Sequence, residues 1–388
     1  KRLRASILMS QGNLRTANFW SRLIKELFIK VFLLRSTWRT RFWSNLFHAF
    51  IVWGFLFYLL VNFYDFSKHF FPLLSLSGKV GNGFRLIADL MSVIILIGIL
   101  YFVLRRFVFK DKALSSRANT LMLPAARSGI LRDSAIVAAL ISLHVASRFL
   151  AESFKLSVIG ADPWQPLASW LSLFWQNDLA SQTAWHVCSW LLLGSLLIFI
   201  PYFSYSKHIH LFFAPLNYIL KPERTSLGAM DAINFDDETV ELFGATHLFE
   251  LDQSAILDAY ACIMCYRCQD VCPPYQTGKL LSPATYEINK RYMLNRMMSH
   301  KNEPPPLVEF AIPTQAIWAC TACAACVDIC PVGVEPMRDI LQIRRGLVLM
   351  ENQFPKPYQL LFRNLERQAN PWGLPQTDRL KWAQGLVV

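Results

Sequence analysis

The sequence has few charged residues for a soluble protein. Only 17% of its 388 residues are charged, whereas an ordinary soluble domain carries about a quarter. Hydrophobic residues make up 54% of the chain and the mean hydropathy is +0.30, which excludes an intrinsically disordered chain. Negatively charged residues are fewer than positively charged ones, with 27 Asp and Glu against 39 Lys and Arg. A basic excess of this kind indicates either nucleic acid or a membrane as a partner.

Cysteine is almost absent outside one short stretch. Eight of the nine cysteines fall between Cys262 and Cys330, and Cys188 stands alone in an apolar run. A secreted disulfide-rich domain would be short and would have cysteine throughout, so this pattern indicates metal ligation in a reducing compartment. A recognisable signal peptide is also lacking, because the basic N-terminus has no short apolar stretch with a small-residue cleavage site. Cys188 is expected to be a small apolar core residue.

Four apolar stretches are long enough to cross a bilayer, which takes about 20 helical residues. They lie at residues 46–64, 86–104, 134–150 and 183–203. Basic residues crowd residues 1–44 and the connection between the second and third stretches, whereas the other connections have few. The positive-inside rule then places both termini in the cytoplasm of a multi-pass plasma-membrane protein. Because the membrane accounts for most of the net charge, nucleic-acid binding is not expected.

Five histidines lie within or beside these stretches, where polar residues are costly. His48 and the pair His208 and His210 fall at the inner level, whereas His144 and His186 fall toward the outer level. A b-type haem needs two imidazoles from facing helices at matched depth. The sequence therefore predicts haem-iron ligands among these five residues. The alternative for each histidine is a hydrogen bond to a neighbouring helix.

The choice between His208 and His210 stays open at this point. At about 100° per residue, His208 lies on the same face as His186 if the helix is straight. Pro201 argues against a straight helix.

Two charged residues in the spans have two possible roles each. Arg148 follows His144 by one helical turn and is expected either to hold a haem propionate or to pair with Glu152. Asp89 follows Arg85 by one turn, so it serves either proton or quinone chemistry or a local ion pair. Arg148 and Asp89 are therefore candidate cofactor-binding residues.

The strongest signal is a doubled C-x2-C-x2-C-x3-C-P motif, in which each cysteine recurs 58 residues later. In such motifs three thiolates hold one 4Fe–4S cluster and the fourth reaches the other cluster. Zinc sites instead use four thiolates in two pairs. The spacing thus predicts two 4Fe–4S clusters with crossed ligands: Cys262, Cys265, Cys268 and Cys330 for one, and Cys320, Cys323, Cys326 and Cys272 for the other.

The composition divides the chain into five parts, and helices expected at residues 282–299 and after Pro336 make the cysteine-rich part α-helical. We expect an all-α protein, a transmembrane four-helix bundle followed by a cytoplasmic α-helical two-cluster ferredoxin domain. The predicted parts are a basic amphipathic segment at 1–44, a cytochrome-b-like membrane domain at 45–218, a polar connector at 219–252, the ferredoxin domain at 253–350 and a tail at 351–388.

Several short segments resemble known families. The cysteine half resembles heterodisulfide-reductase-like membrane iron–sulfur oxidoreductases, including those thought to link electron-transferring flavoprotein to quinone. The membrane half resembles the nitrate reductase gamma subunit, a b-type cytochrome. The first resemblance rests on Arg267-Cys268-Gln269, Thr277-Gly278-Lys279, residues 316–320 and Asn370-Pro371-Trp372-Gly373, and the second on residues 46–48, 201–210 and 214–217.

The resemblance implies an oxidoreductase subunit of a hetero-oligomeric membrane complex. Electrons would pass between a cytoplasmic redox partner, two 4Fe–4S clusters, one or two b-type haems and the membrane quinone. The partner would be a flavoprotein or an iron–sulfur subunit with paired cysteines. The alternatives are an anchor or relay subunit of a heterodisulfide- or thiol-reductase-like complex without its own quinone site, and a non-enzymatic anchoring subunit.

Three details of the resemblance concern ligands and extent. It favours His210 over His208 as the inner haem ligand. In the gamma subunits a second histidine follows ten residues after the equivalent of His48, where this chain has Tyr58. Either His144 substitutes for it or only one haem is present. Many relatives also continue into cysteine-rich repeats, so a catalytic half is expected on another subunit or outside residues 1–388.

Overall fold

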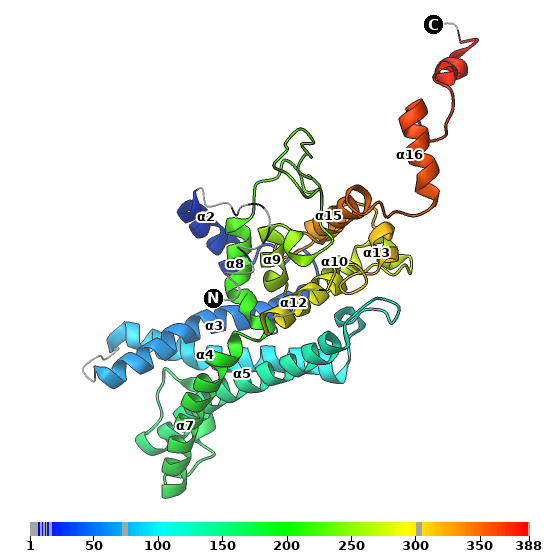
Figure 1. Ribbon diagram of the computed structural model, residues 1–388. Helices are drawn as coiled ribbons and strands as arrows, with labels where there is room; N and C mark the ends of the chain where they lie inside the picture. Colours follow the sequence, from blue (N-terminus) through cyan, green and yellow to red (C-terminus); the bar gives the residue numbers. More distant parts are fainter. Residues whose placement is uncertain are drawn as a thin grey trace.

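The structure is all-α. Within the described residues the only β-type pairing is an isolated bridge between Val308 and Ile312. Figure 1 shows long helices in one half of the molecule and short helices in the other. The all-α class predicted from the sequence is therefore confirmed. The computed structural model describes residues 18–71, 77–299 and 305–386, together with Ile7, Ser10, Gly12 and Leu14, so most of the basic stretch predicted before residue 18 lies outside it.

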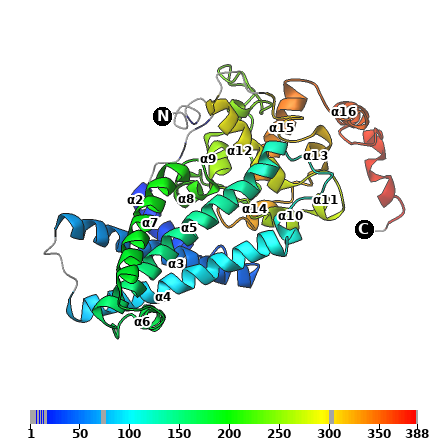
Figure 2. The same cartoon turned by 90° about the horizontal axis from the view of Figure 1, so that it is seen from below.

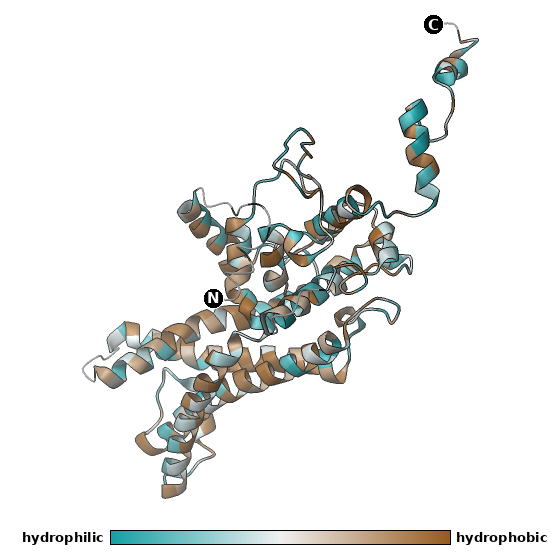
Figure 3. Ribbon diagram, viewed as in Figure 1, coloured by the Kyte–Doolittle hydropathy of each residue, from teal (hydrophilic) through white to brown (hydrophobic). Residues whose placement is uncertain are grey.

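In the part of the chain that the structure describes, four helices are long and apolar enough to cross a membrane, as the sequence predicts. Hydrophobic residues, brown in Figure 3, make up most of the ribbon of these helices. Each begins at or before its predicted start, because the helices continue past the apolar core into polar ends. They are α3 (Phe42–Phe70), α4 (Gly78–Val103, continued to Val108 by a π-helical turn), α5 (Pro124–Ile159) and α7 (Leu179–Phe203).

Helices α3, α4 and α5 share a small buried core that includes Tyr58, Ile95 and Val145. Gly54 permits the close approach of α3 to α4, since a Cβ atom there would lie 2.3 Å from Cγ1 of Ile95. The Tyr58 hydroxyl is 2.6 Å from Ser92 Oγ, so this core also satisfies its polar groups. Helix α7 packs chiefly on α5 and leaves most of its apolar surface uncovered.

Helix α5 joins the two halves of the molecule. Its 36 residues extend about 54 Å, which exceeds the roughly 30 Å hydrocarbon core of a bilayer. Its first turns leave the membrane domain, where Ala126 and Ile130 pack against Met264 and Ile288. Figure 2 shows α5 running from the membrane helices to the short helices. A continuous helix therefore fixes the cysteine-rich half against the membrane half.

Three short helices lie beside the long ones. Helix α6 (Pro166–Ser172) packs on α4 and α5, whereas α8 (His210–Leu220) packs on the cysteine-rich half and α2 (Phe19–Glu26, continued to Phe32 by a π-helical turn) packs on α8. Helix α2 lies on α8, where Arg22 Nη2 donates to the carbonyls of Tyr218 and Lys221 at 3.0 and 3.2 Å. These carbonyls end α8, and a cation is favourable there. Helix α2 leaves Trp20 and Ile24 exposed, which fits the basic amphipathic helix predicted for this segment.

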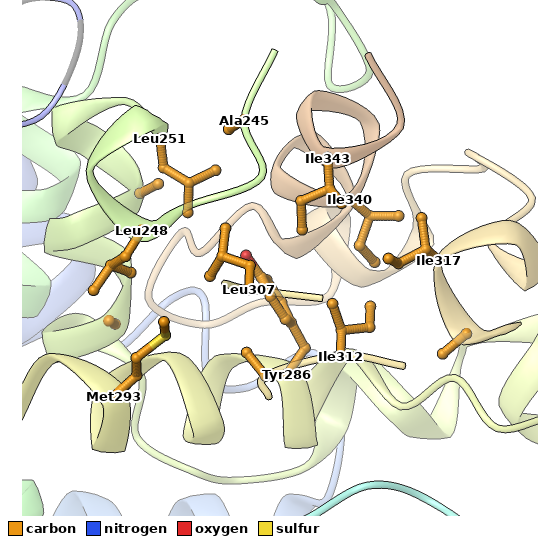
Figure 4. Close-up of a cluster of buried hydrophobic side chains, with 14 of the residues drawn as sticks. Ala245, Leu248, Leu251, Tyr286, Met293, Leu307, Ile312, Ile317, Ile340 and Ile343 are labelled. Carbon is orange, nitrogen blue, oxygen red and sulfur yellow. The ribbon is translucent and has the colours of Figure 1, made fainter. Parts of the chain in front are cut away.

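The cysteine-rich half packs around one apolar core, which includes Leu248, Tyr286, Leu307 and Ile340 (Figure 4). Proline begins three of its helices, where its missing N–H removes no hydrogen bond. The helices are α9 (Gln253–Ala261), α10 (Arg267–Asp270), α11 (Pro273–Gln276), α12 (Pro283–Ser299), α13 (Thr314–Ala319), α14 (Ala325–Asp328) and α15 (Pro336–Leu349).

A buried ion triad ties α12 to α15. Lys290 is completely buried and its ammonium lies 3.0 Å from Glu287 and 2.5 Å from Asp339. The Tyr286 hydroxyl also donates to Asp339, at 3.1 Å. Since α12 follows the first cysteine motif and α15 follows the second, this triad holds the two motifs in one domain.

The C-terminal arm extends away from this domain (Figure 1). It consists of α16 (Pro357–Gln368) and a 3-10 segment (Gln376–Ala383). Trp372 and Trp382 on this arm are 78% and 75% exposed. The connector before the domain is not wholly solvated, because Asp231 forms an ion pair with the buried Arg338.

Candidate functional site

The two cysteine motifs adopt the same backbone conformation. In the first loop Met264 and Tyr266 have φ of 54° and 63°, and in the second Ala322 and Ala324 have 54° and 59°. Such left-handed values are uncommon for residues other than glycine. They turn backbone N–H groups toward the inside of the loop, as in the anion-binding turns around iron–sulfur clusters. One-turn helices, α10 and α14, follow the two loops.

The structure groups the first three cysteines with the last cysteine of the second motif. Burial and the nearby Cys265 thiol raise the pKa of Cys330 to about 12. Burial and then neighbours that include Cys330 raise the pKa of both Cys262 and Cys268. We call Cys262, Cys265, Cys268 and Cys330 the first quartet.

The other four cysteines form a matching group. Burial, followed by the thiols of Cys320 and Cys272, raises the pKa of Cys326 to about 12. Burial also raises the pKa of Cys272 to about 11, with smaller contributions from Cys320 and Cys323. We call Cys320, Cys323, Cys326 and Cys272 the second quartet. The crossed sharing of these eight cysteines between two clusters stays a prediction from their spacing.

Backbone N–H groups point at several of these sulfur atoms. The amide of Val334 donates to Cys330 Sγ at 3.2 Å. Met264 and Ala322, the left-handed residues of the two loops, donate to Cys262 and Cys320 in turn. N–H···S bonds of this kind stabilise thiolates and tune the potential of a bound cluster. The residues present therefore fit 4Fe–4S clusters.

A single metal ion has no such site in the described part of the chain. No three His, Cys, Asp or Glu side chains there are grouped as the ligands of one ion would be. In a 4Fe–4S cluster each thiolate binds a different iron, so the four sulfurs surround the cluster instead of meeting at one point.

The first quartet adjoins the membrane domain. Arg267, which is 7% exposed, donates to the carbonyl of Thr37 at 3.1 Å and to the side chain of Asn45 at the start of α3. Arg41 donates to the carbonyl of Cys265 at 2.8 Å and pairs with Asp270. The first loop is therefore fixed to the N-terminal end of α3.

The second quartet lies nearer the surface. Cys323 is exposed. The aspartate equivalent to Asp270 is Asp328, which pairs with Arg39 at 2.7 Å, and both side chains are about half exposed. Arg39 and Arg41 thus connect one short segment to both motifs.

A cavity separates the first quartet from the membrane helices. Three histidines, His48, His208 and His210, line it together with Cys265 and Arg267. Its empty volume is about 1470 Å³, including the part open to the surroundings. The described lining contains no Asp or Glu but five cationic residues: Arg41, Arg105, Arg106, Lys207 and Arg267. We call this space the histidine cavity.

The imidazole of His210 is in a protonation state that suits a metal ligand. Its Nδ1 lies 2.8 Å from the carbonyl of Lys207, and a carbonyl only accepts, so Nδ1 carries the proton and Nε2 keeps its lone pair. Burial lowers the pKa of His210 to about 3, which keeps the ring neutral. His208 lies beside it, with ring centroids 5.8 Å apart, and its Nδ1 has no described partner.

The end of α7 explains why the helical-face argument for His208 does not apply. Helix α7 stops at Phe203, two residues after Pro201, and a new helix begins at His210. The angular position of His208 relative to His186 therefore cannot be counted along one straight helix.

The two outer histidines are not brought together. His144 lies between helices, with Nδ1 3.1 Å from Ser195 Oγ and Nε2 3.3 Å from Asn62 Nδ2. His186 is exposed and stacks on Trp185. Ser195 lies nine residues beyond His186 on α7, which is about 13 Å along the helix. The structure thus gives His144 the helix-to-helix hydrogen bonds that were its alternative role.

Arg148 and Asp89 have other partners than those expected. Arg148 pairs with Asp65 of α3 and not with Glu152. Arg85 pairs with Asp162 at 2.7 Å, so the expected ion pair between Arg85 and Asp89 is wrong.

Asp89 instead fixes the short helix α6. Its carboxylate accepts the N–H groups of Leu167 and Ala168, at 2.7 and 3.0 Å. These are unpaired amides in the first turn of α6, which a carboxylate satisfies.

Sequence reasoning gave no role to the cations of the histidine cavity. Arg106 and Lys207 both donate to Ser134 Oγ, at 3.0 and 2.9 Å, and neither forms a described ion pair. Arg267 was visible within the first motif, where the second motif has Ala325. Arg267 could have been singled out from the sequence because only the first of the two motifs has a charged residue at this position.

Comparison with known proteins supports the cluster domain. Residues 258–334 match the 4Fe–4S dicluster domain family, and this span contains all eight cysteines of the two motifs. The chain thus joins a 4Fe–4S dicluster domain to four helices able to cross a membrane. No solved structure matches the chain.

Three curated relatives are named as oxidoreductases or as a subunit of a reductase. The chain is 27% identical over 368 residues to the EtfAB:quinone oxidoreductase of Syntrophomonas wolfei, covering 86% of this chain and 50% of that protein. It is 31% identical over 256 residues to the "Probable iron-sulfur-binding oxidoreductase FadF" of Bacillus subtilis, covering 56% and 36%. It is 30% identical over 151 residues to one subunit of the dihydromethanophenazine:CoB–CoM heterodisulfide reductase of Methanosarcina barkeri, covering 36% and 34%.

The chain spans half or less of the length of each of these relatives. The predicted resemblance of the cysteine half to heterodisulfide-reductase-like proteins is confirmed. The resemblance of the membrane half to the nitrate reductase gamma subunit stays a prediction.

Proposed function

We propose that this chain is a membrane-bound electron-transfer subunit linking a soluble redox partner to the membrane quinone through two 4Fe–4S clusters and one b-type haem. One observation carries the proposal. The loop of the first quartet and three histidines line the same cavity at the end of the membrane helices. One-electron carriers placed on both sides of that cavity would form a path between the dicluster domain and the membrane.

The two quartets would hold the clusters, each of which carries one electron at a time. The first quartet lies against the membrane domain through Arg267 and Arg41. The second has an exposed cysteine, Cys323. We therefore assign the second quartet to exchange with the soluble partner and the first to exchange with the membrane domain.

The histidine cavity would hold the haem, which supplies a further one-electron site. His48 from α3 and His210 at the start of α8 are the proposed axial ligands. The free Nε2 of His210 supports this choice over His208. Arg106, Lys207 and Arg267 line the cavity without described carboxylate partners, so they are suited to bind the two haem propionates.

The soluble partner is proposed to be a reduced flavoprotein or an iron–sulfur subunit with paired cysteines, within a hetero-oligomeric complex. The names of the relatives, an EtfAB:quinone oxidoreductase and a heterodisulfide reductase subunit, support these two classes. The partner side would be the cytoplasm, because the basic residues Arg39, Arg41 and Arg117 contact the dicluster domain and basic segments stay inside.

Anaerobic purification from membranes tests this function. We expect about eight irons and eight acid-labile sulfides per chain, together with one low-spin b-type haem by the pyridine haemochrome assay. The His210→Ala variant should lose the haem and keep the iron. His186→Ala serves as the matched control and should keep both. Full haem content in His210→Ala together with haem loss in His48→Ala would move the ligand to His208, and iron near zero in the wild type would overturn the proposal.

A second candidate function is a relay in a thiol- or heterodisulfide-reductase-like complex with no quinone site of its own. The exposed arm with Trp372 and Trp382, together with the heterodisulfide reductase relative, favours it. Added quinone distinguishes the two, because it should reoxidise the dithionite-reduced protein only if the chain has a quinone site.

A further inference from the structure

A second cavity lies at the edge of the membrane domain, between α5, the end of α7 and α12. Its empty volume is about 990 Å³, including the part open to the surroundings. It shares Lys207 and Met264 with the histidine cavity, so only a thin wall separates the two. Besides Lys207, its polar lining consists of Arg132, Asp133, Tyr202, Tyr205, Arg291, Tyr292 and Asn295.

The floor of this cavity has a buried cation with an unused donor. Arg291 is 3% exposed, and its Nη2 donates to the carbonyl of Ser206 at 2.7 Å. Its Nη1 is buried with no hydrogen-bond partner in the described structure. A buried donor without an acceptor is costly, by about 1–3 kcal/mol. Arg291 therefore points to an acceptor supplied by a ligand.

A hydrogen-bonded acid and phenol line the same cavity. The Tyr202 hydroxyl donates to Asp133 Oδ1 at 2.9 Å, and the backbone N–H of Lys207 donates to Asp133 Oδ2 at 3.1 Å. Asp133 shares the lining with Arg132, Lys207 and Arg291, and it would repel an anionic group placed on the Tyr202 side of the cavity. A neutral ligand with oxygen acceptors is able to face both the Arg291 donor and this carboxylate.

The cavity also reaches the surface of the protein. Apolar residues of α5, Ile130 and Ile136, form part of its lining. Tyr205, just beyond the end of α7, is 84% exposed. An aromatic residue with a polar tip is typical of the membrane–water boundary. A ligand held at this boundary would meet the cavity beside Tyr205.

We propose that this cavity binds the headgroup of the membrane quinone, with Arg291 donating to one carbonyl oxygen and the Tyr202–Asp133 pair facing the ring. This inference rests on the proposed function and deepens it by locating the quinone site. It places the site on the side of the dicluster domain, and away from Asp89, whose carboxylate is occupied by α6. Reduction would take two electrons from the soluble reductant and two protons from water, and would form an O–H bond on each former carbonyl oxygen.

Photolabelling of the whole protein in lipid nanodiscs locates the site. The probe is an azido-naphthoquinone, and the labelled peptides are identified by mass spectrometry. We expect label on residues 129–136, 202–205 or 291–295 and its loss when unlabelled naphthoquinone is in excess. Label on the α4 peptide that contains Asp89 would overturn the inference.

Binding measurements with two variants sharpen the test. Arg291→Gln and the more conservative Tyr202→Phe should each raise the Kd for the naphthoquinone by about fivefold to tenfold. Tyr58→Phe, which removes another buried tyrosine hydroxyl of the membrane domain, should leave the Kd unchanged. Iron and sulfide content shows whether each variant has folded. An unchanged Kd in folded Tyr202→Phe and Arg291→Gln would contradict the assignment.

Reoxidation of the dithionite-reduced protein by quinone separates this inference from the proposed function. If quinone reoxidises the protein but the label and the variants point elsewhere, the location is wrong and the function stands. If quinone neither binds nor reoxidises the protein, both fail. If anionic lipid displaces the label and naphthoquinone does not, the cavity is a lipid site and the inference fails.

Discussion

The two cysteine loops share a backbone but differ in what their side chains contact. The left-handed residues of the first loop are Met264 and Tyr266, both nearly buried, whereas those of the second are the alanines Ala322 and Ala324. Arg267 of the first loop reaches the start of α3, and its equivalent is Ala325. A motif of four cysteines therefore sets the turns that surround a cluster, and the residues between them set what each loop is attached to.

The two loops also differ in how far their surroundings cover them. Large side chains fix the first loop between α3 and α5. Small side chains leave Cys323 of the second loop exposed. Cys323 is the most exposed cysteine of the two quartets, since the four cysteines of the first quartet are only partly exposed. These different surroundings are the basis on which we propose the second quartet as the entry site and the first as the exit site.

The largest effect is expected from a substitution that prevents both cysteine loops from binding their clusters. Lys290→Met would leave Glu287 and Asp339 buried without their cation, which costs about 3–5 kcal/mol. The crossed quartets depend on this packing, so we expect neither cluster to assemble. Iron content and cluster absorbance measure the result. Lys381→Met, which breaks an exposed ion pair, is the control, and a Lys290→Met protein with a full complement of iron would contradict the structural role.

The second prediction breaks one quartet at a time. Cys265→Ser and Cys323→Ser should each lose one cluster and keep about half of the iron. In Cys323→Ser, dithionite should still reduce the haem, whereas the soluble partner should not. In Cys265→Ser, the partner should reduce the remaining cluster without reducing the haem. The reverse pattern in anaerobic spectra would exchange the entry and exit sites.

The third prediction concerns Arg267, the cation that the first loop has and the second loop lacks. Arg267→Gln removes a buried cation beside the first quartet, which disfavours the reduced cluster and should lower its potential by about 50 mV, close to a tenfold change for one electron. Ala325→Arg adds the equivalent cation to the second loop. It should raise the potential of the second cluster by less, because water screens that loop. Redox titration followed by EPR measures both, and equal shifts would mean that the two loops have the same surroundings.

Features that depend on nearby positions in the chain could be predicted from the sequence. Cysteine spacing predicted a domain with two 4Fe–4S clusters, which the family match supports, and the length of the apolar stretches predicted the four long helices. The partners of Arg148 and Asp89 were not accessible in this way. Both contact residues more than 75 positions away in the chain, because packing between helices and not the helical repeat decides their partners.

The break after α7 shows a similar limit. Pro201 made a straight helix doubtful, but the turn at Ser204–Ser206 depends on where the dicluster domain docks. Arg291 of that domain binds the carbonyl of Ser206, which is fully buried. The orientation of His208 and His210 is therefore a tertiary property.

The smallest expected effect compares the two arginines that join the motifs to the segment before α3. Arg41 is 16% exposed and contacts Asp270 and the carbonyls of Cys265 and Ala113, so Arg41→Ala should destabilise the first cluster by about 2 kcal/mol. Arg39 and Asp328 lie in solvent, and exposed ion pairs contribute little. Thermal loss of cluster absorbance should therefore occur several degrees earlier in Arg41→Ala and be nearly unchanged in Arg39→Ala. Equal losses in the two variants would show that the second loop is held as firmly as the first, and that its exposure is not what makes it the entry site.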